Sequence, residues 1–367
     1  MGIHKLNIEE FLLLSKDHPV FDVRSPAEYL HAHIPGANSL PLFSDTERAS
    51  VGIAYKQQSR KAAIKIGLDF FGVKMRKMVE EVEGICSDKP SLKSNDIVLV
   101  HCWRGGMRSA GVAWLLDLYG FKVYTLVGGY KVYRNWVLKQ FDISYQFNIL
   151  GGYTGSGKTI VLHQLDRKGE MVINLEGLAN HKGSAFGALG EKPQPGQEMF
   201  ENLLATNLFF KTQMSDPNSA TDKIIWLEDE SQRIGSVNIP FPIWSLMRKS
   251  MLFFIEISFE KRLQYLVQNY GEFKRELLVG SIMRIQKKLG GLETKNAINY
   301  LLENNISECF RILLSYYDKL YTKGLNNREN LEEFLHKVVC TSVDAETNAN
   351  QIKQVLQSAL SMKVLHT

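Results

Sequence analysis

The 367-residue sequence is poor in cysteine and lacks long hydrophobic runs. Its four cysteines are far apart and show no CxxC or Cys/His metal spacing, which argues against a disulfide framework and favours a reducing compartment. The longest apolar stretch, around 251–255, is far too short to cross a bilayer. No apolar signal core follows Met1. We therefore expect a cytoplasmic protein with no membrane partner. The four cysteines are Cys86, Cys102, Cys309 and Cys340.

A strong excess of one charge is also missing, since 44 Lys and Arg stand against 39 Asp and Glu, a net charge of +5. This mildly basic balance is compatible with a nucleic-acid partner but does not establish one. Hydrophobic residues at 44% and charged residues at 23% describe an ordinary globular protein. The length suits two domains, each with its own core.

Short apolar strands alternate with helical stretches in the first part of the chain. Pro19–Arg24, Asp96–His101 and Phe121–Val127 read as strands, and Arg108–Tyr119 has apolar residues at helical spacing. This alternation predicts a parallel α/β domain over residues 1–137. Cys102 then lies on a strand-to-helix turn, a usual place for an active-site loop.

A second α/β domain is predicted over residues 138–258. A strand at Tyr145–Leu150, a helix from Lys158 to about Arg167 and a strand at Met171–Leu175 form a βαβ start, and another strand follows at Lys223–Leu227. The stretch Gly183–Gln197, rich in Gly and Pro, suggests a functional loop. Residues 259–367 are predicted to be helical and to pack on this second domain.

The first candidate site is the run His101–Ser109, which reads H-C-W-R-G-G-M-R-S. A helix N-terminus and arginines favour the thiolate form of Cys102, which is the nucleophilic form. Two adjacent glycines let the backbone curl so that its amides can hold an oxyanion. We predict Cys102 as the catalytic residue. The predicted oxyanion loop comprises Trp103, Arg104, Gly105, Gly106, Met107 and Arg108.

The second candidate site is a G-x-x-x-x-G-K-T phosphate loop between a strand and a helix. Its amides and lysine would hold a polyphosphate, and its threonine hydroxyl suits Mg²⁺. ATP, GTP or another pyrophosphate ester all remain open. Glu228, Asp229 and Glu230 are either the acidic partner of this loop or a solvated strand end. The predicted binding residues are Gly152, Gly155, Ser156, Gly157, Lys158 and Thr159.

Two families use a cysteine loop of this kind. H-C-x-x-G-x-x-R-S matches the signature of tyrosine and dual-specificity phosphatases, but the segments Asp22–Tyr29, His33–Ala37 and Leu126–Tyr130 resemble rhodanese-like domains. The loop is one residue longer than in sulfur-transfer rhodaneses and has the length of rhodanese-like phosphatases. The added width suits a tetrahedral oxyanion, so a phosphatase and a selenophosphate user both remain possible. Asp22 with Arg24, and likewise His33 and His101, are interpreted as structural residues.

The pairing of the two domains narrows the choice further. Glu47–Gln58, Gly151–Thr159, Leu175–Ser184 and Trp226–Gly235 resemble the tRNA 2-selenouridine synthase family. The resemblance implies a rhodanese-like domain followed by a P-loop NTPase-like α/β domain. It also implies a transferase that converts 2-thiouridine to 2-selenouridine at the wobble position of tRNAs for Lys, Glu and Gln. In this family the sulfur is first geranylated with geranyl diphosphate, and selenophosphate then supplies selenium.

The resemblance also implies roles for the two loops. The phosphate loop would hold the diphosphate of the geranyl donor, with Mg²⁺ possible at Thr159. The cysteine loop would accept the phosphate end of selenophosphate while Cys102 attacks selenium. We expect no tightly bound cofactor and a monomer.

Several interpretations remain beside this one. The segment Lys261–Lys295, with eight Lys and Arg against three Glu, either contacts tRNA or is a charged outer helix face. The principal alternative function is a rhodanese-fold phosphatase or arsenate-reductase-like enzyme with an accessory NTP-binding domain. A binding module attached to an NTP switch, and a nucleoside kinase, each leave one of the two loops without a task.

Overall fold

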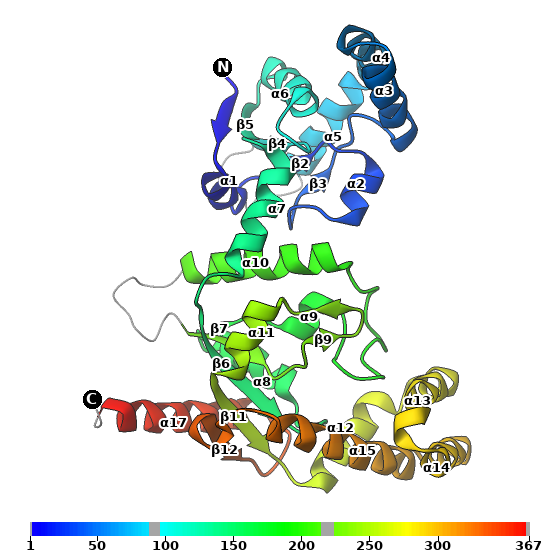
Figure 1. Ribbon diagram of the computed structural model, residues 1–367, viewed down its shortest axis with the longest axis vertical. Coiled ribbons are helices and arrows are strands. Elements are labelled where there is room, and N and C mark those ends of the chain that lie inside the picture. The colour runs from blue at the N-terminus through cyan, green and yellow to red at the C-terminus, as the bar shows by residue number, and fades with distance from the viewer. Residues whose placement is uncertain (1, 88–95, 214–223, 365–367) are drawn as a thin grey trace. The chain divides into compact units, whose positions relative to one another are not determined.

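The computed structural model describes residues 2–87, 96–213 and 224–364. The chain divides into two compact units, Met1–Gln140 with Glu201–Thr206, and Phe141–Phe200 with Asn207–Thr367. Each unit contains a parallel β-sheet with helices packed against it (Figure 1). The predicted α/β fold class is therefore confirmed.

The sheet of the first unit has the order β1-β5-β4-β2-β3, and every pairing is parallel. Its strand β4 carries the unbroken apolar run predicted for a central strand, and four of its five residues are buried. A core of Phe, Val, Leu and Met side chains lies against this sheet and includes residues of α4, α5 and α6. The strands are β1 (His4–Leu6), β2 (Val20–Asp22), β3 (Asn38–Ser39), β4 (Ile97–His101) and β5 (Lys122–Leu126).

The helices of this unit begin at recognisable signals. Helix α3 has a capping box, because the Ser44 side chain accepts from the Glu47 backbone and Glu47 accepts from the Ser44 backbone. Helix α6 ends at Gly120, whose φ of 122° favours glycine. The helices are α1 (Ile8–Ser15), α2 (Pro26–His31), α3 (Asp45–Gln57), α4 (Arg60–Gly72), α5 (Met75–Ser87), α6 (Met107–Tyr119) and α7 (Gly129–Gln140).

The sheet of the second unit has the order β12-β11-β6-β8-β7, again parallel throughout. The strand before the phosphate loop, β6, is its centre, and helix α8 follows the loop as predicted. Lys223, the first residue of one predicted strand, lies outside the described residues. The elements up to residue 256 are β6 (Gln146–Gly152), α8 (Lys158–Arg167), β7 (Met171–Val172), α9 (Leu175–Ala179), α10 (Gln197–Gln213), β8 (Ile224–Glu228), β9 (Arg233–Ile234), β10 (Val237–Asn238), α11 (Phe241–Arg248) and β11 (Met251–Glu256).

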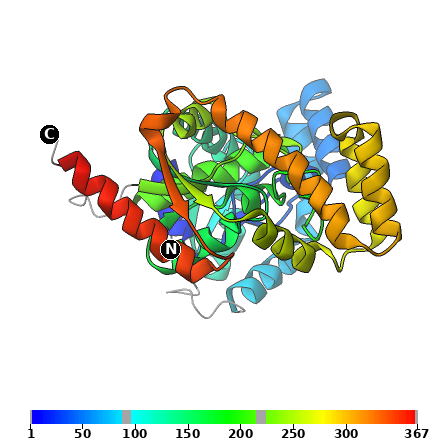
Figure 2. The same cartoon turned by 90° about the horizontal axis from the view of Figure 1, so that it is seen from below.

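The C-terminal region is mostly helical but contributes one strand that the sequence analysis missed. Strand β12 pairs with β11 and completes the second sheet. Figure 2 shows α13 and α14 beside one end of the long helix α15. No helix in the described part of the chain is long and apolar enough to cross a membrane. The elements are α12 (Phe259–Tyr270), α13 (Arg275–Leu289), α14 (Gly291–Leu302), α15 (Ile306–Asn326), α16 (Leu331–Phe334), β12 (Leu335–Val339) and α17 (Ala345–Val364).

Candidate functional site

Cys102 lies at the carboxyl end of the central strand β4, four residues before the N-cap of α6. Its Sγ accepts a hydrogen bond from the Gly106 backbone N–H at 3.3 Å and lies 3.2 Å from the Ser109 hydroxyl. Cys102 itself is only 3% exposed, whereas residues 103–107 are all exposed. The sulfur is therefore at the bottom of a polar loop that opens to solvent.

The environment of the Cys102 thiol favours its ionised form. Burial by itself would raise the pKa, but hydrogen bonds from Ser109 and from the Gly106 and Arg104 backbones outweigh burial, and the net pKa of Cys102 is lowered. This agrees with the predicted nucleophile. The other three cysteines are buried too, and burial raises the pKa of Cys309 to about 12 and of Cys340 to about 11.

Glycine is required at Gly105 and Gly129, where the loop meets the turn after β5. Gly105 has a φ of +63°, and a Cβ there would lie 2.7 Å from the Leu126 carbonyl oxygen. At Gly129, with a φ of +58°, a Cβ would lie 2.2 Å from the Cys102 carbonyl oxygen. The two backbones can approach this closely only without side chains. Gly128-Gly129 thus serves the cysteine loop directly.

The two predicted arginines of the loop have different surroundings. Arg108 is fixed by Glu28, with an Nη1 to Oε2 distance of 2.7 Å, and Glu28 also pairs with Arg48 at 2.9 Å. Arg104 is exposed, and its guanidinium makes no hydrogen bond or ion pair within the described residues. Arg104 is thus available to an incoming anion, while Arg108 is held in place. Glu28 lies in the segment Asp22–Tyr29 that resembles rhodanese-like domains, but the sequence analysis assigned no role to it.

The remaining predicted loop residues form the rim. Trp103 is 38% exposed and its ring lies 5.7 Å from that of Tyr130. Met107 is 52% exposed and begins α6, with its Sδ 3.9 Å from the Arg60 guanidinium. These exposed side chains flank the loop that contains Cys102.

Asp22 and Arg24 form a buried ion pair beneath this site, as predicted. Their Oδ2 and Nη2 atoms are 2.6 Å apart, and Arg24 also donates to the Ala32 carbonyl at 2.7 Å. Burial opposes ionisation of Asp22, but His101 and Arg24 outweigh it and lower its pKa. His33 stacks on Tyr29, with ring centroids 4.0 Å apart, and burial lowers the pKa of the fully buried His101. All four therefore act as scaffold residues.

The phosphate loop connects β6 to α8 through three glycines with positive φ. The values are 154° at Gly152, 80° at Gly155 and 74° at Gly157, which is the N-cap of α8. Ser156 is 1% exposed, and its hydroxyl has no hydrogen-bond partner among the described residues. An unpaired buried hydroxyl is unusual and is consistent with a loop shaped to receive a ligand.

Two side chains of this loop point to internal partners. Lys158 donates from Nζ to the Gly152 carbonyl at 3.0 Å, and Thr159 donates to Glu176 Oε2 at 2.8 Å. A polyphosphate would provide a better acceptor for Lys158 than a carbonyl does, because the new hydrogen bond would join opposite charges. Glu176 lies in the sequence run Leu175–Ser184, yet the sequence analysis assigned no function to it.

The three acidic candidates after β8 have separate positions. Glu228 is fully buried, accepts from the Leu175 N–H at 2.8 Å, and has its pKa raised to about 8 by burial and by Glu176. Burial and the neighbouring Glu176 also raise the pKa of Glu230. Asp229 instead pairs with Arg328 and accepts from the Tyr321 hydroxyl at 2.7 Å. Glu228 and Glu230 therefore face the phosphate loop, and Asp229 is tied to the C-terminal region.

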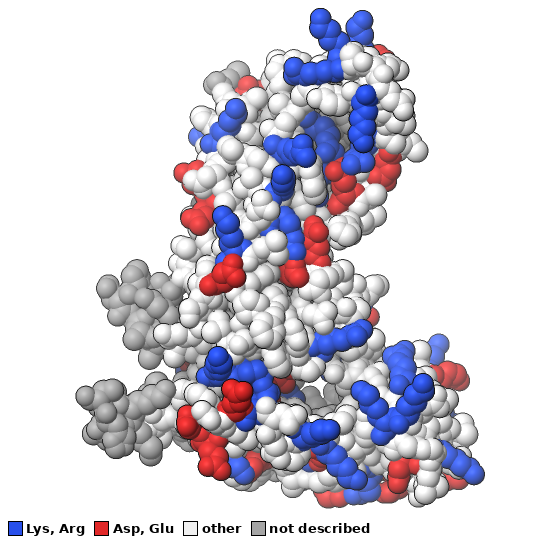
Figure 3. Space-filling model, in the orientation of Figure 1, with Lys and Arg blue, Asp and Glu red and all other residues white. Residues whose placement is uncertain are grey.

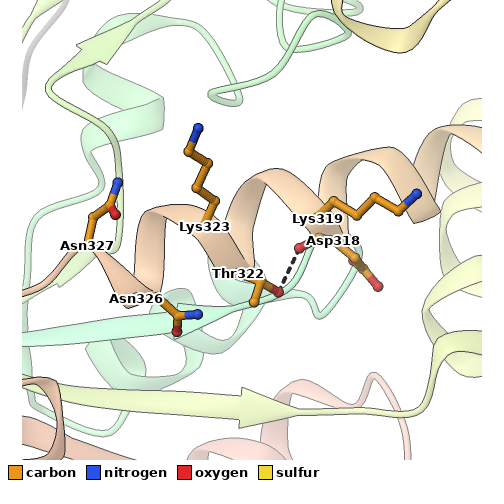
Figure 4. Close-up of a pocket in the computed structure, with 6 residues that line it drawn as sticks. All are labelled: Asp318, Lys319, Thr322, Lys323, Asn326 and Asn327. Carbon is orange, nitrogen blue, oxygen red and sulfur yellow. Dashed lines mark hydrogen bonds between the residues drawn. The ribbon is translucent and has the colours of Figure 1, made fainter.

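Helix α15 forms one flank of the phosphate loop. The Tyr321 hydroxyl accepts from the Gly152 N–H at 3.3 Å, and Asp318 pairs with Arg262 at 2.7 Å, which in turn donates to the Thr154 carbonyl at 3.0 Å. An open cavity of about 560 Å³ lies along this helix (Figure 4). The cavity is wide open, and all six residues that line it have polar or charged groups. The lining residues are Asp318, Lys319, Thr322, Lys323, Asn326 and Asn327.

No group of three or more His, Cys, Asp and Glu side chains within the described ranges is arranged to hold a metal ion. The oxygen donors present nevertheless suit Mg²⁺, because Glu228 Oε1 is buried without a hydrogen-bond partner in the part of the chain that the structure describes, and Thr159 and Glu176 lie together. Mg²⁺ is usually held by one or two carboxylates together with the phosphates of a substrate. The residues fit a metal that arrives with a diphosphate.

The basic residues of the segment Lys261–Lys295 differ in exposure, since Arg262 is buried in its ion pair with Asp318. Lys287 and Lys288 are exposed in the last turn of α13. Tyr270 and Phe273 instead pack against a cluster with Phe186 and Leu189 of the Gly-rich loop. The aromatic side chains thus serve the core, and contact with tRNA through the lysines stays a prediction.

Comparison with known proteins covers both units. Residues 145–349 match the family model described as tRNA 2-selenouridine synthase AAA domain, and residues 7–135 match the rhodanese-like domain. A tRNA 2-selenouridine synthase from Pseudomonas putida is 33% identical over 344 residues, covering 84% of this chain and 88% of that protein. Its namesake from Hydrogenovibrio crunogenus is 33% identical over 350 residues, with coverages of 86% and 92%. The one from Bdellovibrio bacteriovorus is 32% identical over 358 residues, with coverages of 86% and 91%.

Proposed function

Because this chain belongs to the tRNA 2-selenouridine synthase family, we propose that it replaces the sulfur of 2-thiouridine in tRNA by selenium in two steps. The phosphate loop serves S-geranylation with geranyl diphosphate, and the Cys102 loop serves selenium transfer from selenophosphate. The substrates are the wobble uridines of tRNAs for Lys, Glu and Gln.

In the first step, the uridine sulfur attacks the allylic carbon that carries the diphosphate. The new C–S bond forms as the C–O bond breaks, diphosphate leaves with the electron pair, and the uracil ring N–H loses its proton. Lys158 and the loop amides stabilise the charge that develops on the leaving group. Burial and Glu176 raise the pKa of Glu228 to about 8, and Mg²⁺ that arrives with the diphosphate would displace the proton from this carboxyl.

In the second step, the selenium of selenophosphate attacks carbon 2 of the uracil, and the geranylthiolate leaves. The product still carries a phosphoryl group on selenium. The Cys102 thiolate then attacks phosphorus, forms an S–P bond and releases selenium with the electron pair, and water hydrolyses the cysteinyl phosphate. We favour attack at phosphorus because attack at selenium would require phosphorus to leave with the electron pair as phosphite.

The observation that carries this proposal is the Cys102 loop. A thiol with a lowered pKa lies below exposed amides and the exposed Arg104, and Arg108 is fixed by Glu28. Such a loop can hold a tetrahedral phosphoryl group next to a nucleophile, and the loop length supports this use.

The test uses purified protein, tRNA bearing 2-thiouridine, geranyl diphosphate, selenophosphate and Mg²⁺, with the nucleosides identified by mass spectrometry. Lys158→Ala should leave 2-thiouridine unchanged but convert pre-geranylated tRNA to 2-selenouridine. Cys102→Ser should geranylate normally and let selenophosphate displace the geranylthiolate, but stop with the phosphoryl group still on selenium, so that 2-selenouridine is not released. Full-rate geranylation by Lys158→Ala, or normal selenation by Cys102→Ser, would refute the corresponding half.

The phosphatase alternative has the loop length in its favour. If the protein were a simple phosphatase, it would hydrolyse an aryl phosphate ester without tRNA, and Cys102→Ser would abolish this activity. We expect no such hydrolysis above background, since the proposed phosphoryl substrate is joined to tRNA.

A further inference from the structure

The helical hairpin formed by α3 and α4 has no role in the chemistry above, although part of it was among the most specific sequence matches. From Arg48 to Leu68 it contains five Lys and Arg and no Asp or Glu. All five basic side chains are exposed. We propose that this hairpin, here called the basic arm (residues 45–72), binds the single-stranded anticodon loop of tRNA and brings it to Cys102. The five are Arg48, Lys56, Arg60, Lys61 and Lys65.

The basic arm lies directly beside the cysteine loop. Arg48, in α3, pairs with Glu28, which also holds Arg108 of the loop. Arg60, the first residue of α4, has its guanidinium 3.9 Å from Met107 Sδ at the start of α6. Both helices of the arm thus reach the edge of the opening above Cys102, and RNA bound to the arm would lie next to that opening.

Charge complementarity identifies the partner as a polyanion. No carboxylate lies between Arg48 and Leu68, and Asp69 is the next residue. Arg48 is paired with Glu28, so phosphates would meet mainly the positive charges of Lys56, Arg60, Lys61 and Lys65, and their binding would release counterions. In Figure 3, Lys and Arg side chains are more numerous than Asp and Glu in the region where α3 and α4 lie in Figure 1. The two acidic residues at the start of α3 are both engaged, since Asp45 accepts from the Ala27 N–H and Glu47 pairs with Lys74.

Exposed apolar side chains on the arm favour unpaired bases over a regular duplex. Tyr55 and Ile53 are each 54% exposed on α3, and Leu68 is 56% exposed on α4. Apart from Phe71, which packs in the core of the first unit, the residues that the hairpin buries are small, namely Ala54, Ala63 and Gly67. Proteins that recognise RNA loops stack splayed bases on such aromatic side chains while basic residues hold the backbone. The wobble uridine itself is such a base.

The first test measures the affinity of tRNA bearing 2-thiouridine across a range of salt concentrations. The variant Lys56→Ala/Arg60→Ala/Lys61→Ala should bind at least about 10-fold more weakly near physiological salt, and the salt slope should fall by about 2, because each single-strand phosphate contact contributes roughly 0.7. The control Lys77→Ala/Lys122→Ala/Lys139→Ala removes the same charge from exposed positions elsewhere in the first unit and should bind as the wild type does.

The second test separates stacking from charge. Tyr55→Ala should weaken tRNA binding by roughly 5- to 100-fold with an unchanged salt slope, and Tyr55→Phe should bind normally. All substituted side chains are exposed, so circular dichroism should match the wild type. Unchanged tRNA affinity in both the triple variant and Tyr55→Ala would refute the proposed role of the basic arm in tRNA binding. The same result is expected if the basic arm binds a protein partner instead.

This inference rests on the proposed function, but the two can fail separately. A wild-type protein that binds tRNA through the arm and never forms 2-selenouridine would refute the function and leave the arm intact. Normal selenation by the wild type, together with normal tRNA affinity in the basic-arm variants, would refute the role of the basic arm and leave the proposed function intact. A wild-type protein without affinity for tRNA would overturn both.

Discussion

At the scale of single residues, the cysteine loop depends on a carboxylate outside it. Glu28 is the shared partner of Arg108 and Arg48, and it comes from helix α2, far from the loop in sequence. Burial opposes the charge on Glu28, but Arg108 and Arg48 outweigh it and lower its pKa. Glu28 is therefore an anion at neutral pH that keeps Arg108 at the loop, a positioning role.

Glu28→Gln should reduce kcat/KM for selenation of pre-geranylated tRNA by about 10- to 100-fold, because Arg108 loses the charge that holds it in place. Geranylation should be unaffected. Glu80→Gln is the matched control, since Glu80 is paired with Arg76 on the exposed surface of α5. Equal loss of both steps in Glu28→Gln would indicate a general folding defect and contradict the positioning role.

The buried Glu228 predicts a specific pH dependence of stability. Its pKa rises from 4.5 to about 8 in the folded state, so the folded protein holds a proton that the unfolded chain releases. Stability must then fall as pH rises from about 4.5 to about 8. Glu228→Gln removes this dependence and should have the higher Tm at pH 8, with little difference at pH 5, in calorimetric scans. A lower Tm than the wild type at pH 8 would show that the carboxylate is charged when folded.

At the scale of elements, the sequence predicted what local patterns determine. Helix α8 starts at Lys158 and ends at Arg167 as expected, because the phosphate-loop motif fixes its beginning. The buried strands β4, β5 and β8 were equally visible as apolar runs. Strand β12 was missed because its pattern is weak, with only Val338 buried among five residues, and because its partner β11 is about eighty residues away in the chain.

The turn of the cysteine loop offers a test at this scale. Gly105→Ala forces a Cβ to within 2.7 Å of the Leu126 carbonyl at a φ of +63° and should cost about 1–3 kcal/mol of stability and most of the selenation activity. Gly106→Ala is the neighbouring control, because its φ is −103° and a Cβ there meets nothing within 4 Å. Chemical unfolding and nucleoside analysis measure both effects. Equal effects of the two substitutions would contradict the close approach at Gly105.

At the scale of the whole molecule, residues far along the chain complete the first unit. Glu201–Thr206, from the middle of α10, group with residues 1–140. Asn202 is fully buried and donates to the Tyr130 hydroxyl at 2.8 Å and to the His33 carbonyl at 3.1 Å. No local pattern in the sequence could predict this, since the role of a buried asparagine in a helix depends on hydrogen-bond partners that are distant in the chain. The roles of Glu28 and Glu176 likewise depend on partners that are distant in the chain.

Asn202→Ala should lower the free energy of unfolding by about 1–3 kcal/mol, because it leaves buried polar groups of the first unit without partners. Gln213→Ala, at the exposed end of the same helix, should have no measurable effect. Denaturant unfolding of the full chain compares the two variants. Wild-type stability in Asn202→Ala would mean that α10 contributes little to the first unit.

The most direct test of the two-step account is the nucleoside content of tRNA from cells whose only copy of this protein carries Cys102→Ser. We predict that the wobble position carries the uridine whose selenium is still bound to a phosphoryl group, and that 2-selenouridine is absent. If 2-selenouridine were still formed at the wild-type level, or if the wobble nucleoside remained 2-thiouridine, the assignment of the two steps to separate loops would be contradicted.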